Sequence, residues 1–245
     1  MSEPHFFAGA PERGGTVSVT GEDGRHAVRS LRLAPGDALT SSDAHGALVM
    51  CRVVEVGRDR LDAVVEERTV EAAPAPRVSV LLAAPKGERL SWAVQKLTEI
   101  GVDGITILEA ERSVRRWSGE RAARLPERLD AVARAAAKQS GRRFLPEVAG
   151  PVPWDVAMEG ALGEGTVILL WEGAHAGLLR LVPDPPPPVL SLFVGPEGGI
   201  PQERAEAARD GGALLASLGS TLLRTETAAL VGASIALAAV GRLGG

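Results

Sequence analysis

The fold is decided by Phe193-Val194-Gly195-Pro196-Glu197-Gly198-Gly199, and further along the chain by Leu218-Gly219-Ser220-Thr221-Leu222-Leu223-Arg224-Thr225-Glu226-Thr227-Ala228. Each stretch holds a turn that ends an apolar run and precedes a helix-like run. Turns that follow parallel strands meet at one edge of the sheet. The two stretches therefore predict a single cleft for a small ligand.

Strand-like and helix-like runs alternate after residue 76, which predicts an α/β domain with a parallel sheet and helices on both faces. The expected strands span residues 78–83, 105–108, 167–170, 189–194 and 214–215, and the expected helices span residues 90–100, 120–139, 202–209 and 225–240. The last helix is apolar on every side, so it must be covered all round. A partner subunit and a fully internal position are both open as the cover.

The first part of the chain has a different periodicity. Residues 16–19, 47–56 and 60–70 alternate in the manner of strands, and residues 21–32 resemble a short helix, which together predict a small antiparallel barrel. Alternating Pro and Ala near residues 71–76 favour an extended connector. We therefore expect a barrel domain over 1–72, a linker over 73–76 and a larger domain over 77–245.

Composition excludes several classes of protein. The 245 residues are 45% hydrophobic, which is enough for a sizeable core, and the net charge of −4 gives no general attraction to a polyanion. Residues 85–143 are the exception, with 13 Lys and Arg against 8 Asp and Glu. A nucleic-acid contact would have to depend on such a local patch.

The chain also lacks the common signatures of other sites. A single cysteine, Cys51, excludes an internal disulfide and a cysteine-built metal site, and the four histidines are scattered. The longest apolar run, residues 228–240, is short of the roughly 20 residues that cross a bilayer. No Walker loop, Rossmann glycine motif or nucleophile elbow is present. We expect a soluble cytoplasmic protein without a metal and without a membrane partner.

Two charged residues stand out in the second stretch. Gly195 to Gly199 alone is explained by an ordinary strand-to-helix turn. Arg224 and Glu226, however, occur among small and apolar neighbours, ahead of a helix that Thr225 could cap. A structural ion pair between them is one explanation, and a functional pair beside the cleft is the other.

The chain resembles the RsmE family of 16S ribosomal RNA uridine N3-methyltransferases, in the SPOUT superfamily. The two stretches above carry the resemblance, with further matches at residues 26–36, 85–89, 95–102, 111–113 and 139–142. The likeness extends from near residue 5 to the C-terminus. Lys138 and Ser140 depart from the pattern of the resemblance, in which we expect a Glu and a Cys in many relatives.

The resemblance implies a PUA-like barrel that binds RNA, followed by a methyltransferase domain whose C-terminal segment forms a trefoil knot. It also implies a homodimer, whose partner would cover the last helix. S-adenosylmethionine would bind in the knot against Leu170, Trp171, Gly195, Glu197, Gly198, Gly199, Leu218, Gly219, Leu222, Leu223, Thr225 and Ala228. The partner molecule would be 16S rRNA or the small ribosomal subunit.

Methylation at N3 of uridine requires removal of the imide proton. Glu226 is the candidate base, a role typically worth about 10²- to 10⁴-fold. Arg224 would stabilise negative charge on the uracil oxygens or orient the carboxylate. Whether Glu226 is a base or only a structural partner of Arg224 stays open at this point.

RNA contacts are expected from cations that lie in the family motifs or in the basic segment. With no Tyr and 3% aromatic residues, recognition should depend on phosphate contacts and RNA shape. The chosen residues are Arg29, Arg32, Lys86, Arg112 and Arg142. Two alternatives remain: methylation of another position, such as a ribose 2′-oxygen, and a non-catalytic RNA-binding factor in ribosome assembly.

Overall fold

The computed structural model describes residues 3–85, 87–109 and 123–244. Contacts between Cα atoms divide the chain into two compact units. The small unit comprises Met1–Ala73 with Ala137–Leu145, and the large unit comprises Pro74–Ala136 with Pro146–Gly245. Lys86 and Arg112, both expected to contact RNA, lie outside the described residues.

The small unit is built around a five-stranded sheet in the order β1-β3-β4-β5-β2. Its strands are β1 (His5–Phe6), β2 (Thr16–Val19), β3 (Ala38–Ser42), β4 (Ala47–Val56) and β5 (Leu61–Val70). All the pairings are antiparallel except that of β1 with β3, which is parallel. Alternate residues of β4 and β5 are buried, in agreement with the periodicity that predicts these strands.

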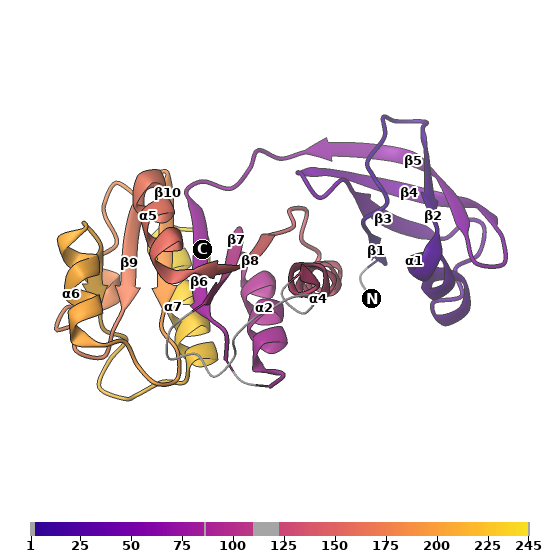
Figure 1. The fold of residues 1–245 in the computed structure, drawn as a ribbon. Helices are drawn as coiled ribbons and strands as arrows, with labels where there is room; N and C mark the ends of the chain where they lie inside the picture. Colours follow the sequence, from indigo (N-terminus) through magenta and orange to yellow (C-terminus); the bar gives the residue numbers. More distant parts are fainter. Residues whose placement is uncertain (1–2, 86, 110–122, 245) are drawn as a thin grey trace. The chain divides into compact units, whose positions relative to one another are not determined.

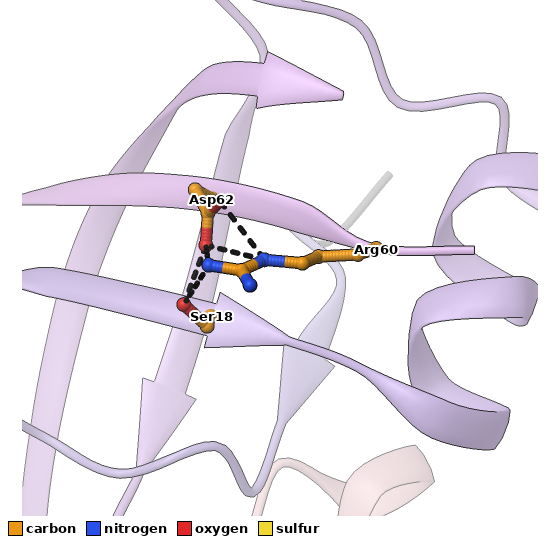
Figure 2. A network of polar contacts seen from close by, with 3 residues as sticks. All are labelled: Ser18, Arg60 and Asp62. Atoms are coloured by element: carbon orange, nitrogen blue, oxygen red, sulfur yellow. Dashed lines mark hydrogen bonds and ion pairs between the residues drawn. The ribbon is translucent and has the colours of Figure 1, made fainter. Parts of the chain in front are cut away.

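The outer face of this sheet carries charged residues that pair with one another. Arg60 donates to Asp62 and to Ser18, joining β5 to β2, as Figure 2 shows. Arg52 makes two hydrogen bonds to Glu66 across β4 and β5. Both arginines are thus paired with a carboxylate on a neighbouring position of the sheet.

Two short helical segments follow β2 where the sequence predicts a single helix. They are α1 (Gly21–Arg25) and the π-helical turn η1 (His26–Ser30). Asp23 of α1 accepts a hydrogen bond from Lys138, with Nζ 2.6 Å from Oδ1. Lys138 therefore ties this helical segment to residues 137–145 of the same unit.

The large unit holds a six-stranded sheet in the order β11-β9-β10-β6-β7-β8 (Figure 1). All five pairings are parallel, as predicted. The strands are β6 (Arg77–Ala83), β7 (Gly104–Glu109), β8 (Glu147–Pro153), β9 (Thr166–Leu170), β10 (Val189–Val194) and β11 (Leu214–Ala216). β8 was not expected, because Gly150, Pro151 and Pro153 favour a loop, and its place at the sheet edge is what tolerates proline.

Helices cover both faces of this sheet. On one face α2 (Arg89–Ile100), α4 (Leu125–Ser140) and α7 (Thr225–Ala239) pack against one set of strand side chains. On the other, α5 (Trp154–Glu164) and α6 (Gln202–Asp210) pack against the alternate set, which includes Phe193. A 3₁₀ turn, η2 (Leu178–Arg180), contacts α7. The central strands are apolar on both faces for this reason.

Two kinds of feature are not seen in the described part of the chain. None of its helices combines the length and the apolar character that crossing a membrane requires. Nor does any group of three or more His, Cys, Asp or Glu side chains there form a potential metal site.

Candidate functional site

A cavity of about 740 Å³ lies at the carboxyl ends of β9, β10 and β11. These strands are neighbours in the sheet, so the loops that follow them converge at one edge. The volume is in the range of small-molecule and cofactor sites. The two stretches that decide the fold form most of its wall, so the sequence prediction of a single cleft is confirmed.

The first wall is the glycine-rich turn after β10. Gly199 has φ of +74°, which favours glycine, and its N–H donates to Pro196 O at 2.9 Å. A Cβ on Gly199 would lie 2.8 Å from Glu172 Oε1, and one on Gly195 would lie 2.4 Å from Ile200 Cγ1. The turn therefore keeps this shape only with glycine at both positions.

The second wall is the segment that follows β11, which is tied to the loop after β9. Trp171 N–H donates to Ala216 O at 2.9 Å, and Leu178 N–H donates to Ser217 O at 3.1 Å. In return, Ser217 N–H donates to Ala176 O at 2.8 Å. These reciprocal bonds fix the two loops against each other and hold the cavity open between them.

Thr225 links the second wall to the first. Its hydroxyl donates to Gly195 O at 3.0 Å, joining the start of α7 to the glycine-rich turn. The prediction that Thr225 caps α7 was wrong, because the N-cap residue is Arg224 and makes no side-chain capping bond. The threonine already lies inside the helix, and its side chain is committed to the turn instead.

The residues expected to bind a cofactor all lie on the cavity wall. Those on the β9 and β10 side are Leu170, Trp171, Gly195, Glu197, Gly198 and Gly199; those on the β11 and α7 side are Leu218, Gly219, Leu222, Leu223, Thr225 and Ala228. This convergence shows that the residues share one cavity. Their contact with S-adenosylmethionine stays a prediction.

Arg224 and Glu226 are arranged differently from the structural ion pair that the sequence allowed. Arg224 is exposed and lines the cavity, whereas Glu226 is 8% exposed and is not on the cavity wall. Glu226 Oε1 lies 3.5 Å from Nε of Arg89, a residue to which the sequence gave no role. Its other oxygen, Oε2, is buried and has no hydrogen-bond partner among the described residues.

Arg89 also contacts the glycine-rich turn. Its Nη1 donates to Glu197 Oε1 at 2.7 Å, and Arg89 itself lines the cavity. No periodicity or motif spacing could have paired it with Glu197 or Glu226. The signal appears only once β6 is known to lie beside β10, because the loops after both strands then meet.

Two of the three described residues expected to contact RNA are exposed and one is partly buried. Arg29 is exposed and paired with Asp59, and Arg32 is exposed with φ of +55°, which is uncommon for a residue other than glycine. Arg142 is partly buried, with its N–H bonded to Ala137 O. RNA contact by these residues stays a prediction.

Comparison with known proteins gives matches over nearly the whole chain. A family model described as an RNA methyltransferase domain matches residues 71–237, and one described as an RNA methyltransferase PUA domain matches residues 19–66. A ribosomal RNA small subunit methyltransferase E of Mycobacterium bovis is 36% identical over 237 residues, which is 95% of this chain and 88% of that protein.

Solved structures agree with the sequence matches. A Legionella pneumophila protein solved with the bound cofactor SAM has a TM-score of 0.87 and 28% identity, covering 98% of both chains. A ribosomal RNA small subunit methyltransferase E from Neisseria gonorrhoeae, bound to S-adenosyl methionine, has a TM-score of 0.86 at 24% identity and covers 97% of this chain and 98% of that one. At this identity, the likeness to the Neisseria gonorrhoeae protein supports the fold alone.

Proposed function

The chain belongs to the RNA methyltransferase family, the RsmE group, and from this premise we propose that it methylates N3 of a uridine in 16S ribosomal RNA with S-adenosylmethionine as the donor. The observation that carries the proposal is the cavity formed by the two glycine-containing walls. It brings the glycine-rich turn together with a cation on the wall, Arg224, and a buried carboxylate nearby, Glu226.

The cavity fits S-adenosylmethionine in size and charge. Its volume of about 740 Å³ accommodates a nucleoside with an amino-acid tail. Glu172, on the wall, places negative charge where a cationic ligand would lie, whereas Glu197 is paired with Arg89. When bound, this group supplies a methyl carried on positively charged sulfur. The residues of the two walls bind and orient it, and the glycines leave room for close approach.

Glu226 and Arg224 have different roles at the uracil ring. Oε2 of Glu226, which lacks a donor in the described chain, accepts the imide proton of N3 as the methyl group transfers. S-adenosylmethionine held in the cavity would supply the methyl group to the N3 lone pair, and S-adenosylhomocysteine would be the product released. Arg224, exposed at the cavity, stabilises negative charge on the uracil oxygens.

RNA binding is assigned to the small unit and to the basic segment. We take residues 1–72 as a PUA-like RNA-binding domain, 73–76 as a linker and 77–245 as the methyltransferase domain, which the family matches support. Arg29, Arg32 and Arg142 would contact phosphates. A cytoplasmic location is part of the same proposal.

Two features of α7 support a homodimer and a knot. Leu230, Val231 and Ile235 are only partly buried in a single chain, so a second copy would cover them. The segment between β11 and α7 is hydrogen-bonded to the loop after β9, and α7 packs beneath the central strands. Passage of this segment through that loop would give the trefoil knot.

The test is methyl transfer to defined RNA. Wild-type protein and labelled S-adenosylmethionine are incubated with 16S rRNA and with small subunits from cells lacking the protein, and the nucleosides are identified by mass spectrometry. N3-methyluridine at one position supports the proposal. Label on a ribose oxygen or another base contradicts the proposed position, and no binding of S-adenosylmethionine in calorimetry contradicts the enzyme.

A further inference from the structure

Arg89 is placed by the sheet at the junction of the two cavity walls. It is the first residue of α2, after the turn that follows β6, and Gly87 in that turn has φ of +68°. β6 pairs in parallel with β10, so the loops at their carboxyl ends lie side by side. A side chain from the first loop can therefore reach the glycine-rich turn of the second.

The guanidinium of Arg89 lies between two carboxylates. One is Glu197 of the glycine-rich turn, at 2.7 Å, and the other is Glu226 of α7, at 3.5 Å. The Glu226 side chain is only 10% exposed, so its negative charge would be costly without a neighbouring cation. Arg89 supplies that cation and also separates the two carboxylates.

The contact with Arg89 does not use the full hydrogen-bonding capacity of the Glu226 carboxylate. At 3.5 Å, the approach of Nε to Oε1 is an ion pair longer than an ordinary hydrogen bond. Oε2 is buried without a donor, an unfavourable state that a ligand donor would relieve. Arg89 thus fixes the carboxylate by charge, while its other oxygen stays without a hydrogen-bond donor among the described residues.

Resting on the proposed function, we propose that Arg89 is a positioning residue that acts through two carboxylates at once. Through Glu197 it holds the glycine-rich turn in the shape that binds S-adenosylmethionine. Through Glu226 it holds the carboxylate in line for the uracil proton. It touches neither reacting atom itself, so its removal acts on cofactor affinity and on methyl transfer by separable routes.

Lysine could not replace this residue in full. The guanidinium presents Nη1 to one carboxylate and Nε to the other, whereas a lysine ammonium is a single point of charge. Arg89→Lys should therefore keep part of the charge effect but lose the simultaneous alignment. Misplacement of a reacting group by about 1 Å can cost about 10²-fold in rate.

The experiment measures kcat and the KM for S-adenosylmethionine separately, with full-length protein and 16S rRNA or small subunits. Arg89→Ala should raise the KM about tenfold and lower kcat about 10- to 100-fold. Millimolar guanidinium ion should restore part of kcat in this variant. Arg209→Ala, on the exposed end of α6, removes an arginine outside the cavity and is the matched control.

Combination with carboxylate variants separates positioning from a general loss of structure. In a Glu226→Gln background, Arg89→Ala should add nothing to the loss of kcat but should still raise the KM. In a Glu197→Gln background it should add nothing to the KM but should still lower kcat. Independent, multiplying effects in both backgrounds would overturn the inference.

The outcomes also distinguish this inference from the proposed function. If wild-type protein methylates uridine and Arg89→Ala matches it within about twofold in kcat and KM, only the role of Arg89 is refuted. Loss of activity in Arg89→Ala with no rescue by guanidinium and with a lowered melting temperature also refutes it. If wild-type protein neither binds S-adenosylmethionine nor methylates RNA, both proposals are refuted together.

Discussion

Arg242 anchors the segment after α7, and its replacement should destabilise the large unit. The guanidinium donates to both carboxylate oxygens of Asp103, to Pro76 O at 2.8 Å and to Gly101 O at 2.9 Å. The Arg242 and Asp103 side chains are 11% and 14% exposed. One side chain thus holds the C-terminal segment against the start of β6 and the turn between α2 and β7.

The expected cost follows from this burial. Removal of one partner from a buried ion pair costs about 3 to 5 kcal/mol, because the other charge is left uncompensated. Asp103 keeps the Val78 N–H donor at 2.8 Å and is slightly exposed, so Arg242→Met should cost about 3 kcal/mol. With a urea m value of about 3 kcal/mol per molar, the unfolding midpoint falls by about 1 M.

Tryptophan fluorescence in urea is the assay, at one fixed protein concentration. All four tryptophans lie between residues 92 and 171, so the signal reports on the large unit. Arg209→Ala, at an exposed pair with Asp210, is the control and should leave the midpoint unchanged. Asp103→Asn should lower the midpoint, and the double variant with Arg242→Met should lose less than the sum of the two.

Two results would refute this reasoning. A midpoint for Arg242→Met equal to that of the control would mean that the pair contributes nothing to the stability of the fold. Strict additivity of Arg242→Met and Asp103→Asn would mean that the two side chains act independently, contrary to their hydrogen bonds.

Gly199→Ala should weaken binding of S-adenosylmethionine about tenfold in calorimetry, because φ is +74° and a Cβ would lie 2.8 Å from Glu172 Oε1. Gly160→Ala on α5, with open space around it, is the control and should leave the affinity unchanged. Equal affinities for the two variants would contradict this prediction. Burial, with a nearby carboxylate, raises the pKa of Cys51 to about 11, so a disulfide reagent at pH 8 should label it only in denaturant, and rapid labelling of folded protein would refute the burial. Burial, together with the charges of Lys138 and Arg143, lowers the pKa of His5 from 6.5. The unfolded chain therefore binds the proton more readily than the folded protein does, and the free energy of unfolding should fall as the pH drops below about 6.5. Thermal melts at pH 7.5 and 5.5 test this, since His5→Gln should lose less stability over that interval than wild-type protein does.

The sequence predicted those helices and strands whose apolar residues recur at a regular spacing because they are buried in the core. α2 and the central strands β6, β9 and β10 follow that rule, because their apolar residues must pack whatever their neighbours are. β8 escaped prediction, since an edge strand tolerates the glycine and prolines that elsewhere mark a loop. β1 has two residues, too few for a period to appear, and is a strand only because β3 lies beside it.

The cavity could be predicted from the sequence, but the ion pairs within it could not. Loops after neighbouring parallel strands converge by rule, so two glycine-containing turns were enough to indicate one cleft. The partner of Glu226 depends instead on strand order. Arg89 reaches it only because β6, early in the domain, lies next to β10, late in the domain. Spacing along the chain carries no information about that adjacency.

The separation of Arg224 from Glu226 follows from the way α7 begins. Arg224 is the N-cap residue with extended backbone, φ −67° and ψ 154°, and Glu226 is already in the first helical turn. Residues two apart at a helix start do not face each other, so a pair close in sequence is directed to different surroundings. One charge remains at the cavity, open to a substrate, and the other is buried against Arg89. The two charges therefore do not neutralise each other, and the ion-pair partner of Glu226 is Arg89 instead.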